Sequence, residues 1–242
     1  MMLLKDIKRP VVLFDLDGTL LPMDYDRFEK TYFAGLSKAA PEVPVRQLIA
    51  AIWEGMAAMV ANDGTRTNRE VFAEVFSART GLNYFENEAR FMAYYRTGFQ
   101  VCVSCCHLPC ASAELVRVLQ RKGYLVAVAT NPVFPEIATH TRLQWLGLDA
   151  SEFPLVTTFD NCGFAKPNPA YYEDVCRRLD VSPADCVMIG NDVEEDGAAA
   201  VMGMEVILVR DCLLNRKNLP MDNFVSCTME ELKRWANDLP SN

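Results

Sequence analysis

Short apolar runs alternate with helical patterns in the first and last parts of the chain. The first run, Val11–Phe14, ends abruptly at Asp15, as is typical of a parallel strand buried on both faces. Similar runs predict four more strands, at residues 124–129, 155–156, 186–189 and 206–209. Helical patterns predict helices at residues 113–122, 134–146, 169–179 and 194–202. This alternation indicates an α/β fold, a doubly wound parallel sheet with helices on both faces.

Residues 22–108 break the alternation, because their pattern is helical throughout. Asn62-Asp63-Gly64 is a helix stop signal, and Thr67 with Glu70 forms a capping box. Helices are expected at about residues 25–39, 45–61, 68–80 and 85–103. The sequence therefore predicts an all-helical domain at residues 22–108, inserted into a core of residues 1–21 and 109–242. A second capping box, Thr228 with Glu231, predicts a last helix through Trp235.

The length of 242 residues allows one sizeable core plus a smaller appendage. The net charge of −8 argues against nucleic-acid and polybasic membrane partners. No apolar run reaches the roughly 20 residues that a membrane span requires, and residues 1–10 lack a signal-peptide run. Nine scattered cysteines favour a reducing, cytoplasmic setting.

The string Asp15-Leu16-Asp17-Gly18-Thr19 directly follows the first predicted strand. Its two carboxylates point to the same side if the chain stays extended. Since no lysine or arginine is adjacent, they repel each other unless a cation lies beside them, and a divalent metal would supply it. The structural alternative is a strand end with an Asx turn that the glycine permits.

Two further polar sites lie near predicted strand ends. Thr130 and Asn131 follow residues 124–129, where a hydroxyl and an amide can hold an anionic oxygen; a turn that starts at Pro132 explains them equally well. Lys166 precedes a predicted helix, and Pro167 keeps it extended. A lone lysine is usually solvated, but the acidic motifs elsewhere require compensating charge.

The last motif runs from Gly190 to Asp196, again directly after an apolar strand. Asp192 stands at the strand end and Asp196 one helical turn further, so both can face one pocket. Oxygen ligands at strand ends suit Mg²⁺ better than zinc. An acidic helix N-terminus explains Glu194 and Glu195 but not Asp192.

In this order, the four motifs resemble those of the haloacid dehalogenase superfamily, of the phosphatase type with an α-helical cap. The match covers residues 11–21 and about 108–209, and implies a Rossmann-like core with a cap after the first motif. In that family Asp15 would be a nucleophile that forms an aspartyl-phosphate. Asp17 would be the general acid and base, with its backbone carbonyl on Mg²⁺.

The resemblance also assigns the remaining motif residues. Thr130 and Lys166 would contact the phosphate, together with Asn131 and Gly18. Asp192 would complete the metal site with Asp15 and Asp17. Asn191 and Asp196 would contact the residues that hold the metal. Asn191 could also bind the metal directly or through a water molecule.

These residues predict a Mg²⁺-dependent phosphatase, since neutralised charge, in-line attack and a proton for the leaving oxygen are what phosphate-ester hydrolysis needs. The resemblance implies a small phosphorylated metabolite as substrate, because a cap over the site favours small molecules. A phosphomutase would use the same four motifs. A catalytically silent binding module is a further alternative, although the acidic residues are all present. A dehalogenase is disfavoured, because it needs no acid at Asp17. The identity of the substrate and the oligomeric state cannot be read from the sequence.

Other features have simpler explanations. The cysteines between Cys102 and Cys110 lack a distant second ligand pair, so we expect buried thiols rather than zinc. Residues 108–111 are expected to form a hinge. The aromatic residues of the predicted helical domain recur at helical spacing and are expected in its core: Phe28, Tyr32, Phe33, Phe72 and Phe76. His140 is expected on a helix face. Three arginines are expected in solvent, although each could bind a substrate anion: Arg66, Arg69 and Arg96.

Overall fold

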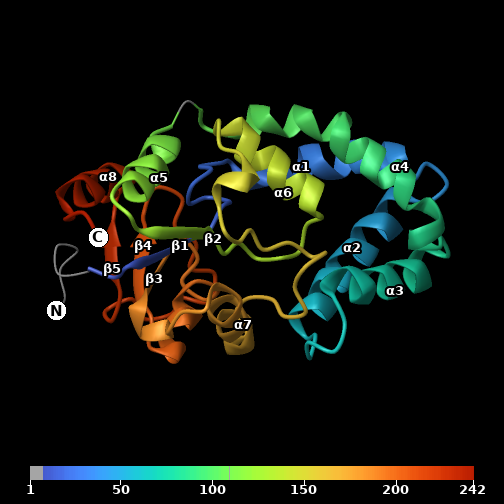
Figure 1. The fold of residues 1–242 in the computed structure, drawn as a ribbon. Coiled ribbons are helices and arrows are strands. Elements are labelled where there is room, and N and C mark those ends of the chain that lie inside the picture. The colour runs from blue at the N-terminus through green and yellow to red at the C-terminus, as the bar shows by residue number, and fades with distance from the viewer. Residues whose placement is uncertain (1–7, 109) are drawn as a thin grey trace.

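Five parallel strands form one sheet in the computed structural model, which describes residues 8–108 and 110–242 (Figure 1). The strands are β1 (Val11–Phe14), β2 (Leu125–Val128), β3 (Cys186–Gly190), β4 (Glu205–Val209) and β5 (Val225–Cys227), in the order β2-β1-β3-β4-β5. The chain runs from β1 to β2 on one side and returns to β3 on the other. The topological switch point, where such sheets bind ligands, therefore lies at the carboxyl ends of β1 and β3.

Helices cover both faces of the sheet (Figure 1). Val12 and Phe14 pack on the face covered by α5 (Ser112–Arg121) and α8 (Met229–Asp238). Val11 and Leu13 pack on the opposite face, against α7 (Pro169–Leu179) and the 3₁₀ helix η6 (Gly197–Met202). Successive side chains of a strand point to opposite faces, so each strand contributes to both cores. The predicted doubly wound α/β fold is confirmed.

A helical segment stands between β1 and α5, beside the sheet (Figure 1). Its main helices are α1 (Tyr25–Leu36), α2 (Val45–Val60), α3 (Asn68–Thr80) and α4 (Tyr84–Arg96), with the short 3₁₀ helix η2 (Ser37–Ala39) after α1. The two crossings to the core run side by side, since Asp24 N donates to Cys105 O at 2.9 Å and His107 N donates to Pro22 O at 2.8 Å.

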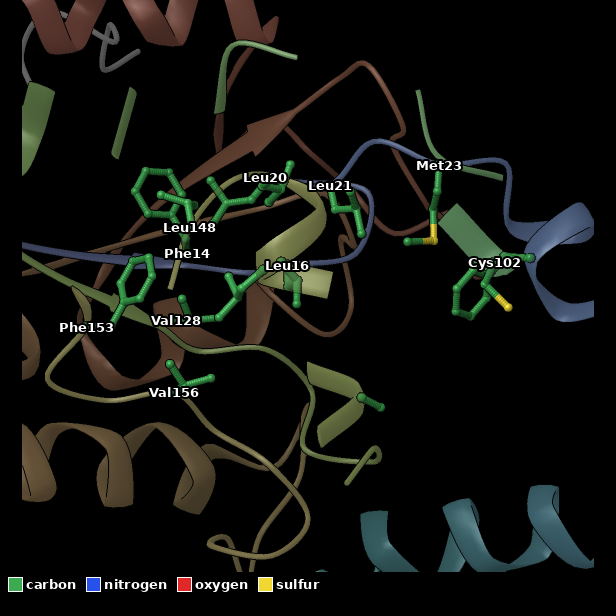
Figure 2. Packing of buried hydrophobic residues seen from close by; sticks show 14 of the residues in the cluster. Phe14, Leu16, Leu20, Leu21, Met23, Cys102, Val128, Leu148, Phe153 and Val156 are labelled. Atoms are coloured by element: carbon green, nitrogen blue, oxygen red, sulfur yellow. The ribbon is translucent and has the colours of Figure 1, made fainter. Parts of the chain in front are cut away.

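The hydrophobic core of the sheet continues into this helical segment. Figure 2 shows Phe14 and Val128 next to Leu148, Phe153 and Val156. Of the aromatic residues predicted for the core of the segment, Phe72 is half-buried and the others are buried.

Several predicted elements differ from the structure. The helix predicted at 85–103 ends at Arg96 and continues as the 3₁₀ helix η3 (Gly98–Cys105), because glycine favours a break. Residues 155–156 form only a single bridge, between Val128 and Val156. The helix predicted at 194–202 is a turn followed by η6. Strand β5 was not predicted, since its pattern spans only three residues.

The remaining expectations concern the hinge at residues 108–111, the N-terminal segment, a membrane-spanning helix and the bounds of two helices. Pro109 of the expected hinge at 108–111 and residues 1–7 of the N-terminal segment lie outside the described residues. In the remainder of the chain, no helix is long and apolar enough to cross a membrane. α6 (Glu136–Trp145) is shorter than the predicted 134–146, and α8 begins directly after the predicted capping box at Thr228.

Candidate active site

Asp15 and Lys166 form the centre of the site at the carboxyl end of β1. The backbone N–H of Asp15 donates to Ile189 O of β3 at 2.9 Å, which fixes the residue at the switch point. Lys166 is fully buried, and its Nζ lies 3.0 Å from Asp15 Oδ1 and 2.6 Å from Asp196 Oδ1. A buried ammonium is tolerated where carboxylates surround it, and these carboxylates hold the pKa of Lys166 well above its usual range despite burial.

Negative charge at this site exceeds positive charge. Burial raises the pKa of Asp15 to about 7, and the nearby carboxylates of Asp196 and Asp17 act in the same direction. Lys166 opposes this rise but does not cancel it. The site therefore has room for more positive charge next to Asp15.

Asp17 has a cationic partner that the sequence did not reveal. The guanidinium of Arg142, on α6, pairs with Asp17 Oδ2, and Arg142 is 1% exposed. No lysine or arginine is adjacent to the two aspartates in the sequence, and the fold brings Arg142 to Asp17 from a distant helix. Burial still raises the pKa of Asp17, with Arg142 and Lys166 opposing.

The turn after Asp17 is held by hydrogen bonds within the protein. Gly18 has φ +82°, and a Cβ there would lie 2.0 Å from the Tyr25 hydroxyl, so only glycine fits. The Gly18 N–H donates to Leu21 O at 2.8 Å. Gly18 was expected to contact phosphate; its N–H is instead engaged in the turn, and the residue serves the turn's shape.

Tyr25 and Thr19 link this turn to the last motif. Tyr25 OH donates to Asp17 O at 2.6 Å and accepts from Asn191 Nδ2 at 3.0 Å. Thr19 Oγ1 donates to Asn191 Oδ1 at 2.9 Å. The side-chain amide of Asn191 is therefore engaged by protein groups and braces the two loops.

Asp192 and Asp196 shape the loop after β3. Asp196 Oδ2 accepts from the N–H groups of Asn191 and Asp192, both at 2.9 Å, while its other oxygen receives Lys166. Asp192 Oδ1 accepts from the N–H groups of Glu194 and Glu195, at 2.9 and 3.0 Å. These bonds replace the predicted helix start at residue 194 with a turn.

Thr130 and Asn131 lie after β2, next to Lys166. Thr130 is buried, and its carbonyl accepts from Tyr171 OH at 2.9 Å and from Thr157 Oγ1 at 2.7 Å. Asn131 Oδ1 accepts from the N–H of Lys166 at 3.2 Å. The structure thus brings the ends of β1, β2 and β3 and the Lys166 segment together, as the motifs predicted.

The residues proposed to hold a metal suit Mg²⁺ in chemistry. Asp15 and Asp192 offer carboxylates and Asp17 offers a main-chain carbonyl, all oxygen donors. Nowhere in residues 8–108 and 110–242 do three His, Cys, Asp or Glu side chains form a metal-binding group. Mg²⁺ is commonly held by one or two carboxylates with several waters, so this set fits it and does not fit zinc. The excess negative charge at Asp15 points the same way.

Some side-chain contacts of the site were not predicted from the sequence, namely those of Arg142, Tyr25, Thr19 and Arg216. Arg216 Nη1 pairs with Asp192 Oδ2 at 3.0 Å. Arg142 had a detectable signal, because it lies four residues after Ala138 and four before Leu146, on the buried face of α6. A charged residue on such a face requires a partner.

Other candidates lie away from the aspartates. His140 Nδ1 is 3.8 Å from Glu136 on its own helix. Arg66 pairs with Glu74 and Arg69 with Glu88, both at 2.5 Å. Cys102 and Cys105 are buried among the helices of the segment 22–108, which we call the insert.

A cavity of about 610 Å³ lies above these residues, between the sheet and the helices of the segment 22–108. We call it the central cavity. Asp15, Asp17, Asn131 and Asp192 line it from the sheet, and side chains of α1 to α4 line it from the opposite side.

Comparison with known proteins agrees with this geometry. The N-acetylmuramic acid 6-phosphate phosphatase of Pseudomonas putida is 27% identical over 199 residues, 82% of each chain. The phosphoglycolate phosphatase of Cupriavidus necator is 26% identical over 82% of this chain and 80% of its own. The glyceraldehyde 3-phosphate phosphatase of Methanothermobacter thermautotrophicus is 38% identical, but over only 38% of this chain and 39% of its own.

Comparison with solved structures and with family models also agrees with this geometry. A phosphatase structure from Thermococcus onnurineus superposes with a TM-score of 0.58 at 19% identity, over 96% of this chain and 99% of that one. A model of the haloacid dehalogenase-like hydrolases matches residues 10–203. The predicted resemblance is confirmed: the chain is an enzyme that belongs to the haloacid dehalogenase-like hydrolase family.

Proposed function

We propose that this protein is a Mg²⁺-dependent phosphatase that hydrolyses a small phosphorylated metabolite through an aspartyl-phosphate on Asp15. The observation that carries the proposal is the Asp15 carboxylate at the end of β1, with Lys166 Nζ 3.0 Å away and the central cavity in front of it. A carboxylate and a phosphate ester approach each other only where positive charge is held nearby. The phosphatase names of the relatives support this reaction.

The residues divide the reaction into two steps. Asp15 attacks phosphorus, the ester P–O bond breaks, and Asp17 gives its proton to the leaving oxygen. Asp17, now ionised, then takes a proton from water that attacks the same phosphorus, so inorganic phosphate leaves and Asp15 is restored. Lys166 offsets the charge on the phosphoryl oxygens, and Asn131 and Thr130 border its position.

Asp15, Asp192 and the Asp17 carbonyl would hold Mg²⁺. When bound, the ion would neutralise charge on the transferring phosphoryl group. In the structure Asp17 O accepts from Tyr25 and Asp192 pairs with Arg216, and Arg216 has a largely exposed side chain that can move away at small cost.

The helical segment 22–108 is proposed to act as a cap that limits access to small molecules. The proposed catalytic core comprises residues 1–21 and 109–242. All nine cysteines are free thiols, which supports a reducing compartment such as the cytoplasm.

Phosphate release from a panel of phosphomonoesters tests the proposal. We expect EDTA to abolish release by the purified protein, Mg²⁺ to restore it, and Asp15→Asn to remain inactive with Mg²⁺ present. Full activity after exhaustive chelation would refute the metal assignment. Parent-level activity in Asp15→Asn would refute the nucleophile.

A further inference from the structure

The helical side of the central cavity is apolar and rich in aromatic rings. Six of the rings that line it are Phe28, Tyr32, Phe33, Phe72, Phe76 and Phe91. Ile52 and Met56 of α2 add aliphatic surface. Because Asp15 and Asp17 line the same cavity, a group that leaves from a phosphate held at Asp15 would enter this apolar space.

Three tyrosine hydroxyls on this side are already paired. The hydroxyls of Tyr32 and Tyr95 share a hydrogen bond of 2.7 Å. Tyr25 OH donates to Asp17 O. A sugar-like group with many hydroxyls would place most of them against the aromatic rings, and unpaired polar groups are costly to bury.

Positive charge is kept away from the helical side. Four arginines of the insert each pair with a glutamate of the insert instead: Arg66 with Glu74, Arg69 with Glu88, Arg79 with Glu54, and Arg90 with Glu42. Among the described residues that line the cavity, the insert contributes the acidic Asp26 and Glu29 and no Lys, Arg or His. The lining cation Arg216 pairs with Asp192 on the sheet side.

We propose that the substrate is a phosphate monoester whose leaving group is uncharged and apolar, a long alkyl or aryl group that fills the helical side of the central cavity. The inference rests on the proposed phosphatase function and adds its substrate class. A leaving group with a second anionic charge is disfavoured, because the exposed carboxylates of Asp26 and Glu29 at the lining would repel it and the described residues of the helices there offer no cation.

A series of linear alkyl phosphates from propyl to octyl tests the substrate class. The leaving-group basicity is nearly constant along this series, so differences in kcat/KM report the cavity. We expect kcat/KM to rise about fourfold for each methylene until the cavity is filled. Heptyl phosphate and its analogue with a terminal carboxylate in place of the methyl group form a matched pair, and the carboxylate should lower kcat/KM by at least about a hundredfold.

Two variants of α2 supply a matched comparison. Met56→Lys places an ammonium at the cavity lining, and we expect it to flatten the chain-length series and to favour the carboxylate analogue. Val45→Lys adds the same charge at an exposed position of the same helix, 52% exposed, and should leave the series unchanged.

A binding measurement covers the case in which Met56→Lys fails to fold. Calorimetry of Asp15→Asn should show tighter binding of octyl than of propyl phosphate, with a more negative heat-capacity change for octyl phosphate as apolar surface is buried. Equal affinity and equal heat-capacity change would overturn the inference.

The failures of the two proposals are distinguishable. If acetyl phosphate, a small activated compound, is hydrolysed but kcat/KM is flat along the alkyl series or highest for the carboxylate analogue, the substrate class is wrong and the phosphatase stands. If neither acetyl phosphate nor any phosphomonoester is hydrolysed, both proposals fall.

Discussion

Arg142 and Asp17 form a buried ion pair between α6 and the turn after β1. Arg142 Nε donates to Ala138 O and Nη2 donates to Thr139 Oγ1, both at 3.1 Å. Its guanidinium carbon lies 4.3 Å from the centroid of the Phe134 ring. The pair therefore holds one oxygen of Asp17 in a fixed position.

The other oxygen of Asp17 is not engaged by another protein group among the described residues. Asp17 Oδ1 is buried and has no hydrogen-bond partner within the described part of the chain. A general acid needs one oxygen near the leaving group, and a carboxylate fixed through its second oxygen meets this need. We therefore assign Arg142 as a positioning residue for Asp17.

Arg142→Met should destabilise the protein most at alkaline pH. Loss of Arg142 raises the pKa of Asp17 further, so the unpaired carboxylate costs most at alkaline pH and less at acidic pH, where protonation removes its charge. We expect a loss of about 3–5 kcal/mol in the free energy of unfolding near pH 8 and a smaller loss near pH 5. Urea titrations at both pH values measure it.

Arg79→Met is the matched control for this experiment. It breaks the exposed pair with Glu54, which should cost at most about 1 kcal/mol at either pH. A loss for Arg142→Met that matches this control would show that the buried pair does not stabilise the site.

Asp192 should show two separable roles. Asp192→Asn keeps an oxygen that accepts from the N–H groups of Glu194 and Glu195, whereas Asp192→Ala removes it. We expect Asp192→Ala to be about 1–2 kcal/mol less stable than Asp192→Asn. Both changes remove the carboxylate and should raise the Mg²⁺ concentration needed for half-maximal activity.

Urea unfolding and Mg²⁺ titrations measure the two roles. Equal stability of the two variants would contradict the role of Asp192 in the loop. An unchanged Mg²⁺ requirement in both would remove Asp192 from the metal site.

Features that depend on residues close together in the sequence could be predicted, whereas features that depend on contacts between distant segments could not. β1 and β3 could be predicted because each is a buried apolar run that ends at an acidic or amide residue, and parallel strands bring those ends together. β5 could not, because Val225 and Cys227 enclose one polar residue and give too short a pattern. The turn at residues 193–196 was missed because Asp192 binds the backbone in place of a helix.

The site shows the same division. Asp15, Lys166 and Asp192 belong to local motifs whose residue types reveal their chemistry. The Arg142–Asp17 pair is a contact between distant segments, so neither residue's neighbours reveal it. The apolar lining of the central cavity also comes from four helices, and their aromatic residues were predicted only as core.

The stability of the metal-free protein should fall as pH rises. Burial raises the pKa of Asp15 from 3.8 to about 7, so folding favours its protonated form. Its stabilising contribution is present below about pH 4 and is lost as pH rises through about 7, with a slope of at most about 1.4 kcal/mol per pH unit. Urea midpoints in EDTA between about pH 5 and pH 8 should decrease, and Asp15→Asn should flatten this decrease. The same slope in parent and variant would assign the effect to other carboxylates.

Asp17→Asn should separate the two steps of the proposed reaction. The change keeps the backbone carbonyl and loses only the proton, and general acid–base catalysis is typically worth about a hundred- to ten-thousand-fold. Alkyl phosphates should lose most activity, because their leaving oxygen needs that proton. Aryl phosphates, which leave as stable anions, should still phosphorylate Asp15.

Breakdown of that aspartyl-phosphate also needs Asp17, as the base that activates water. With an aryl phosphate, Asp17→Asn should therefore release a burst of phenolate and then turn over slowly. Rapid-quench mass spectrometry should find the phosphoryl group on the peptide that contains Asp15, and Asp15→Asn should give no burst. Parent-rate turnover of alkyl phosphates by Asp17→Asn would show that another group moves the proton, and the Arg142–Asp17 pair would then be structural only.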